Sequence, residues 1–217
     1  MAWNGLFIAE PVKFKKKYRA PRLDKKLDCA YAVCGAYADA HYFPERATKV
    51  LDILISTKDR PHAQSALKKK STHYDYFWTS HDFFILRWSR LYLSLINSEE
   101  EWVENGIKEA QNNKGAFGEP TLTFPFLILS KLWVGSRQGF MDVARLIARA
   151  DQLQLQQTKE VVEQYLPSAL QELRALYKVG KAEIQNAPNS KNYVNKPNSF
   201  SLWHIQNAED AIIENII

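Results

Sequence analysis

The segment 73–98, HYDYFWTSHDFFILRWSRLYLSLINS, constrains the fold most because it is densely aromatic and has almost no polar face. Its apolar positions recur at spacings of four and three, the period of an α-helix. The stripe is Phe77, His81, Phe84, Trp88, Leu91 and Leu95, and the narrow polar strip is Ser80, Arg87, Arg90 and Ser94. A helix that is apolar around most of its circumference is buried among other helices. We therefore expect a central core helix here.

Similar periodicity predicts helices along most of the chain. The expected helices are 23–42, 45–56, 99–110, 121–134, 140–150, a long one capped by Thr158, and 208–217. Pro125 favours a helix start in 121–134, although the β-branched and aromatic content of that stretch leaves a strand as the alternative. Pro167 is expected to kink or split the long helix. With only 8 Gly, the composition also disfavours a loop-rich β-sandwich.

The fold class predicted from these patterns is all-α, with antiparallel helical hairpins packed in one domain. Residues 1–22 read as a basic N-terminal arm, in which Lys13 to Arg19 lie between two prolines; it is either a solvated segment or a binding arm. Residues 23–217 are expected to form the single domain, with an extended polar loop at 185–201.

A similarity between two parts of the sequence suggests helical repeats. A shift of 38 residues places Trp88, Leu91 and Leu95 on Phe126, Leu129 and Trp133. Two hairpins of similar pattern in tandem are how helical repeats begin, so a repeat-like architecture is the alternative within the all-α class.

Catalytic motifs are missing from the sequence. His73 and His81 are eight apart, whereas helical metal ligands prefer spacings of three or four, and no HExxH occurs. Neither a GxSxG elbow nor a glycine-rich phosphate loop is present. We therefore expect no catalytic, cofactor-binding or metal-ligating residue, no enzyme activity and no small-molecule substrate. The weaker alternative is a helical enzyme with a site around His81 and Asp82.

The cysteines and the N-terminus point to the cytoplasm. Cys29 and Cys34 are five apart in an expected helix, so their side chains would point about 140° apart and should not form a disulfide. Free thiols favour a reducing compartment. The start MAWNGLFIAEPVKFKKK lacks the order of a signal peptide. The most apolar window, 124–134, is too short to span a bilayer, so no membrane partner is expected.

Basic side chains are the candidate partner-binding residues, namely Arg87, Arg90, Lys68, Lys69 and Lys70. The net charge is +5, but acids are interspersed through most of the chain. Nucleic-acid binding is therefore disfavoured, and a protein partner is expected.

Residues 76–110, YFWTSHDFFILRWSRLYLSLINSEEEWVENGIKEA, resemble all-α immunity proteins of bacterial polymorphic toxin systems, including type VI secretion-like effectors. Those proteins carry an aromatic-rich helix, a short Asn/Ser or Asp break and an acidic amphipathic helix. The resemblance implies a cytoplasmic protein that occludes one toxin domain and has no catalytic residue. The positive charge would suit an acidic toxin surface. The alternative is a helical-repeat scaffold or adaptor that binds several proteins.

Overall fold

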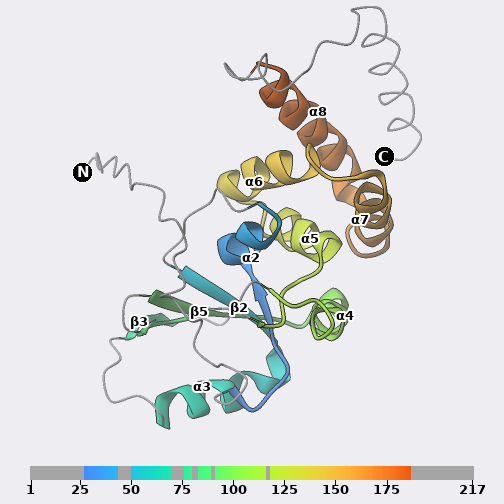
Figure 1. The fold of residues 1–217 in the computed structure, drawn as a ribbon. Helices are drawn as coiled ribbons and strands as arrows, with labels where there is room; N and C mark the ends of the chain where they lie inside the picture. Colours follow the sequence, from blue (N-terminus) through green and yellow to red (C-terminus); the bar gives the residue numbers. More distant parts are fainter. Residues whose placement is uncertain are drawn as a thin grey trace, which may run out of the picture. The chain divides into compact units, whose positions relative to one another are not determined.

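The computed structural model describes residues 27–43, 50–69, 76–79, 83–88, 91–115 and 118–186 (Figure 1). For residues 68–69, 76–79, 83–88 and 91–92 it describes the backbone alone. Helices make up most of the described chain, so the predicted helical character is confirmed, but a five-stranded mixed sheet is also present and the fold is not purely all-α. The chain forms two compact units, Met1–Thr121 and Leu122–Ile217. The expectation of one domain over 23–217 stays a prediction.

The sheet belongs to the first unit and has the strand order β1-β2-β5-β4-β3. Its strands are β1 (Ala32–Cys34), β2 (Val50–Ser56), β3 (Tyr76–Thr79), β4 (Phe83–Trp88) and β5 (Leu91–Ser98). The pair β2 and β5 is parallel, and the other neighbours are antiparallel. Residues Pro120 and Thr121 continue the pairing beyond β1 through Val33.

The expected central helix over 73–98 is the largest error. The chain there forms β3, β4 and β5, separated by short segments that lie outside the described residues. A segment that is apolar on all sides fits a helix template at nearly every position, but strands covered on both faces also read as continuous apolar runs. Its many aromatic and β-branched residues favour the strand.

Two further expected helices contain strands. The second half of 45–56 is β2, in which Leu51, Ile53, Leu54 and Ile55 are all buried. Consecutive buried positions mean that both faces of this strand are covered. Within 23–42, β1 comes first and α2 (Gly35–Tyr42) follows it.

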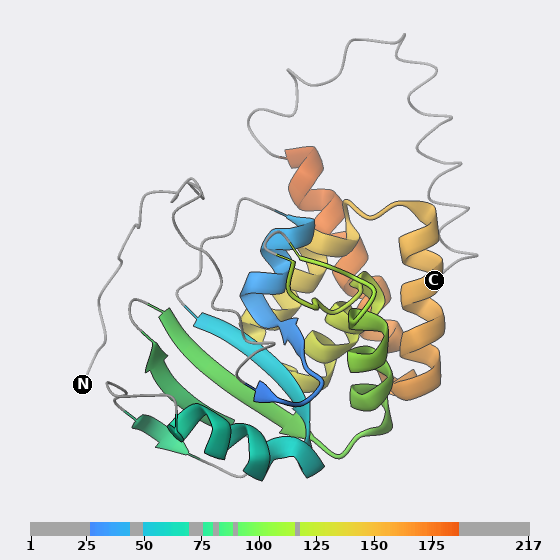
Figure 2. The ribbon, with the colours of Figure 1, turned by 60° about the horizontal axis from the view of Figure 1, so that its bottom comes forward.

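Helices cover the parallel strand pair on both sides. Figures 1 and 2 place α2 on one face of the sheet and α3 (Arg60–Lys69) on the other. A short 3-10 turn, η1 (Thr57–Asp59), leads from β2 into α3, and α4 (Glu101–Ala110) follows β5. The α4 side chains Trp102, Val103, Ile107 and Ala110 are buried, as the amphipathic pattern of 99–110 predicts.

The second unit consists of helices, and here most predictions are confirmed. Its elements are α5 (Phe124–Val134), α6 (Arg137–Ile147), α7 (Gln152–Tyr165), η2 (Pro167–Ala169) and α8 (Leu170–Asn186). Pro125 lies in the first turn of α5, and Pro167 separates α7 from α8, as expected. Thr158 does not begin a helix: α7 starts at a capping box on Asp151, and the Thr158 hydroxyl donates to Gln154 O inside it.

The remaining architectural expectations have different outcomes. The sequence similarity at a shift of 38 residues relates strand residues of β4 and β5 to the helix α5, so it does not mark a structural repeat. The basic arm at 1–22, residues 187–201 of the polar loop and the expected helix 208–217 lie outside the described residues. Among the helices that the structure describes, none is long and apolar enough to cross a membrane.

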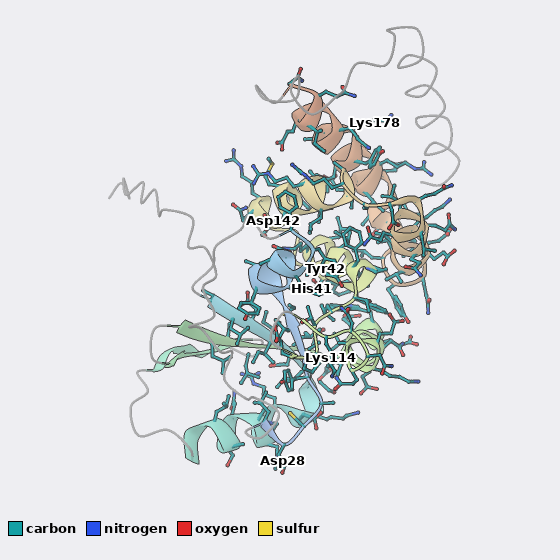
Figure 3. All side chains as sticks on the ribbon, viewed as in Figure 1. Asp28, His41, Tyr42, Lys114, Asp142 and Lys178 are labelled. Atoms are coloured by element: carbon teal, nitrogen blue, oxygen red, sulfur yellow. The ribbon has the colours of Figure 1, made fainter. Side chains whose placement is uncertain are left out.

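A buried ion pair joins α5 to α6. Lys131 Nζ lies 3.3 Å from Asp142 Oδ2, and both side chains are more than nine-tenths buried. Gln138 Nε2 donates to the other carboxylate oxygen at 3.1 Å. Figure 3 shows Asp142 on α6. Removing one partner of such a pair leaves a buried charge without its counter-charge, which costs more than the pair itself contributes.

We expect Lys131→Met to lower the free energy of unfolding by about 3 kcal/mol. The double variant Lys131→Met with Asp142→Leu should recover most of that loss, because it leaves no buried charge behind. Urea denaturation of the full chain, followed by circular dichroism, measures both. Equal loss in the single and double variants would contradict this account of the pair.

Candidate functional site

The turn from β1 into α2 brings a helix start against an acidic side chain of the sheet. Gly35 opens α2 with φ of +60°, a left-handed conformation that glycine adopts readily. A Cβ atom at position 35 would collide with the carboxylate of Asp52 on β2. The absence of a side chain at position 35 therefore lets the Asp52 carboxylate reach the start of α2.

Asp52 lies in a row of small polar side chains that crosses the sheet. Cys34 of β1 and Ser94 of β5 are its registered partners on either side. Registered residues on neighbouring strands point to the same face, with Cβ atoms about 5 Å apart. The three side chains therefore point to the face that α2 covers.

Ser94 is almost completely buried, with 3% of its surface exposed. It therefore belongs to the buried part of this polar row.

A second acidic group lies beside the first turn of α2. Burial raises the pKa of the Tyr37 phenol well above its usual range, and the negative charge of Glu119 raises it further. Glu119 itself is buried and lies against Gly115, where a Cβ atom would contact its carboxylate. Tyr37 therefore stays protonated at physiological pH and can donate a hydrogen bond, but it cannot act as a base.

Polar side chains also gather at the carboxyl ends of β2 and β5. Lys58 Nζ lies 2.7 Å from Glu104 Oε1, and Ser56 Oγ donates to the same oxygen at 3.4 Å. This pairing raises the pKa of Lys58 and lowers the pKa of Glu104, chiefly through their hydrogen bond. Asn97 Nδ2 donates to Thr57 Oγ1 at 3.4 Å. These contacts tie η1 to α4 and β5, so we interpret the cluster as structural.

A third polar group surrounds Cys29. Burial, with the negative charges of Asp59 and Asp28, raises the pKa of this thiol to about 11. His62 Nε2 lies 3.5 Å from Asp28 Oδ2 on the exposed surface (Figure 3 labels Asp28). Cys29 and Cys34 are both free, as the sequence predicts. A thiol held neutral in this way is a poor nucleophile, so this group is not a catalytic site.

The structure describes only some of the residues singled out from the sequence, and none of their side chains. Arg87 is a residue of β4, and Lys68 and Lys69 lie in the last turn of α3, where the structure describes the backbone alone. Arg90, Lys70, His81 and Asp82 lie outside the described residues. Their role in partner binding stays a prediction.

Sequence reasoning missed Gly35 and Asp52, although both give a signal. Asp52 is the one charged residue in the apolar run VLDILIS, and a charge inside such a run is more informative than its apolar neighbours. Gly35 interrupts the helical pattern of 23–42, where an isolated glycine indicates a close backbone approach or a break.

Comparison with known proteins finds no sequence relative. No protein-family model and no curated protein matches the chain. Solved structures with some similarity include a solution structure of the antibiotic-resistance factor ANT(2'')-Ia, at 10% identity and a TM-score of 0.42. That match covers 75% of this chain and 89% of the other. A crystal structure of ANT(2'')-Ia in complex with adenylyl-2''-tobramycin matches at 8% identity and a TM-score of 0.39, covering 74% and 91%.

These findings overturn the expected class of protein. The residues 76–110 that carried the resemblance to all-α immunity proteins form β3, β4, β5 and α4, not two helices. The similar structures are of an antibiotic-resistance factor, not of a toxin inhibitor or a scaffold. One of them is in complex with adenylyl-2''-tobramycin, so the expected immunity protein, with a single toxin partner, no enzyme activity and no small-molecule substrate, is not what the comparison finds. At these TM-scores the likeness itself assigns no activity to this chain.

We expect Gly35→Ala to destabilise the protein more than Gly135→Ala. Both glycines have nearly the same left-handed φ, +60° and +64°, so both variants bear the strain of about 1 kcal/mol or more that alanine meets there. Only position 35 adds a collision with Asp52, because the nearest atom to a Cβ at position 135 is 3.9 Å away. Thermal unfolding of the two variants measures the difference, and equal losses would contradict the close approach of Asp52.

We expect Cys29 to react with iodoacetamide at pH 8 at least tenfold more slowly than free cysteine, because its raised pKa leaves little thiolate. The rate should rise steeply between pH 9 and pH 11, as the thiol ionises. Mass spectrometry of alkylated peptides measures the rate at each thiol separately. A rate at pH 8 equal to that of free cysteine would show that the pKa is not raised.

Proposed function

We propose that the first unit binds a phosphate-bearing small molecule together with a divalent cation, at the start of α2 beside Asp52. In this proposal the protein is an enzyme that transfers a phosphate-containing group. The observation that carries it is the approach of the Asp52 carboxylate to Gly35. Two features that phosphate chemistry uses, a helix start and a carboxylate, thereby lie within contact of each other.

The helix start supplies the attraction for an anion. The first backbone N–H groups of a helix have no partner within the helix, and the helix dipole places a partial positive charge there. Phosphate groups bind at such positions, often beside a glycine that lets the backbone come close. Gly35 occupies that place in α2.

The negative charge of Asp52 means that a phosphate ligand at this site needs a cation. A carboxylate at the same place repels a phosphate group, and a divalent cation between the two removes that repulsion. Mg²⁺ is held in phosphate sites by one or two carboxylates, and it takes its other ligands from phosphate oxygens and water. No group of three or more His, Cys, Asp or Glu side chains among the described residues could hold a metal ion. A cation shared with the ligand therefore fits this protein better than a permanently bound one.

These parts suit group transfer. Catalysis at phosphorus depends mainly on positioning and on neutralising the charge of the phosphate oxygens. In this proposal Asp52 holds the cation and the backbone of the α2 start orients the phosphate. Tyr37 lies in the first turn of α2, and its protonated phenol is a hydrogen-bond donor there.

The test is isothermal titration with ATP and, separately, with inorganic tripolyphosphate, each with and without Mg²⁺. We expect binding of both with Mg²⁺, and a loss of at least tenfold in Asp52→Asn, whose amide is a poor cation ligand. Without Mg²⁺, Asp52→Asn should bind tripolyphosphate more tightly than the natural chain, because the repelling charge is gone. Tighter binding of ATP than of tripolyphosphate would indicate that the nucleoside is also recognised.

The matched control is Asp28→Asn, which removes an exposed carboxylate outside the site. It should leave both affinities unchanged. If Asp52→Asn lowered only the thermal stability, Asp52 would serve merely to stabilise α2. If neither ligand bound the natural chain with Mg²⁺, the proposed function would be wrong.

A further inference from the structure

The last described helix of the second unit carries its basic side chains on one flank. Arg174, Lys178 and Lys181 of α8 are spaced by four and three residues, so they lie on one face of the helix. We call these three residues the basic stripe. Arg174 and Lys178 are exposed and Lys181 is half-buried, and Figure 3 shows Lys178 on α8. Gln171 and Gln185 continue the same face by about one turn in each direction.

The acidic residues of α8 lie on another side of the helix. Glu172 and Glu183 are separated by close to three helical turns, so they share a face that lies roughly 120–140° around the axis from Lys178. Glu183 is paired there with α6, since Arg145 Nε lies 3.6 Å from Glu183 Oε2. Acids interspersed along the sequence disfavour nucleic-acid binding, but in α8 the fold separates the two signs of charge.

The basic stripe opposes the stability of its own helix. The positions that neighbour Lys178 on the helix surface, three and four residues away, hold Arg174, Ala175, Lys181 and Ala182. These neighbours include no acid, and like charges at such spacings destabilise a helix. Lys181 Nζ lies 5.3 Å from the centre of the Tyr177 ring, a contact that positions the ammonium group and leaves its charge in place. The stripe is therefore a concentration of positive charge that α8 itself does not neutralise.

We propose that the basic stripe binds the phosphate backbone of a nucleic acid. Its three charges span about 10 Å along the helix axis, because each residue rises by about 1.5 Å. The phosphates of one strand follow each other about every 3.4 Å along a duplex, so the stripe can face about three of them.

An acidic protein fits this surface less well than a nucleic acid does. Protein interfaces are built around apolar and aromatic anchors, whereas the face that runs from Gln171 through the stripe to Gln185 carries only basic and amide side chains. Interfaces with nucleic acids are polar and positively charged.

The experiment measures binding by fluorescence anisotropy with two labelled probes, a duplex DNA of about 20 base pairs and a single-stranded RNA of about 20 nucleotides. In the triple variant Arg174→Gln with Lys178→Gln and Lys181→Gln, we expect the affinity at about 50 mM salt to fall at least tenfold. The slope of log affinity against log salt concentration should become shallower by about 2.7 with the duplex, because three phosphate contacts no longer release counterions. Glutamine is a good helix former, so α8 should fold as in the natural chain.

The matched control replaces three exposed cations of other segments, Lys108→Gln with Lys114→Gln and Arg137→Gln. Both triple variants remove three charges and take the net charge from +5 to +2, so they differ only in the position of the lost charges. The control should keep the slope of the natural chain. Asp52→Asn should also leave binding of both probes unchanged, because this inference does not rest on the proposed function.

Three outcomes would overturn the inference. An equal loss of affinity in the two triple variants would show that binding follows net charge alone. The natural chain might also bind neither probe, which would leave the stripe without a nucleic-acid ligand. Displacement of the duplex by polyglutamate as readily as by unlabelled DNA would indicate an acidic protein partner.

Discussion

The parallel pairing of β2 with β5 is the constraint on which the first unit depends. The two strands are in register over their common length, from the pair Val50 and Tyr92 to the pair Ser56 and Ser98. Parallel neighbours require a long crossover connection and apolar cover on both faces. The crossover contains α3, β3 and β4, and the cover comes from α2 on one face and α3 on the other (Figure 1). The position of α2, and with it the contact of Gly35 with Asp52, follows from this need for cover.

The success of sequence reasoning differed between the two units for a physical reason. The helices α6, α7 and α8 of the second unit bury one side each, and helices there end at recognisable residues, such as Gly135 after α5 and Pro167 after α7. These helices could therefore be predicted from the helical spacing of their apolar residues and from the glycine and proline residues at their ends. The strands of the first unit are short and apolar on both faces, and a helical spacing can be found in any such run. Phe84, Trp88 and Leu91 satisfied the helix template without belonging to a helix.

The candidate site was predictable only in part. The acid inside VLDILIS and the glycine inside the expected first helix are visible in the sequence, and each departs from its surroundings. The contact between these two residues cannot be predicted from the sequence. Residues 35 and 52 meet only when β1 pairs with β2 and α2 folds back over the sheet. The register that sets Ser94 beside Asp52 likewise depends on the crossover, so a polar residue in LYLSLINS reads as part of a helix surface until the strands are known.

The surroundings of Asp52 differ from those of the buried carboxylate of Asp142. Asp142 is enclosed by long side chains, and Lys131 and Gln138 bind its two oxygens, so folding itself satisfies that carboxylate. Around Asp52 the neighbouring positions carry small residues instead, with Gly35 against the carboxylate and Cys34 and Ser94 on either side. The Asp52 carboxylate thus lies against the backbone at the start of α2, between small side chains, and this is the position where our proposal places a cation shared between protein and ligand.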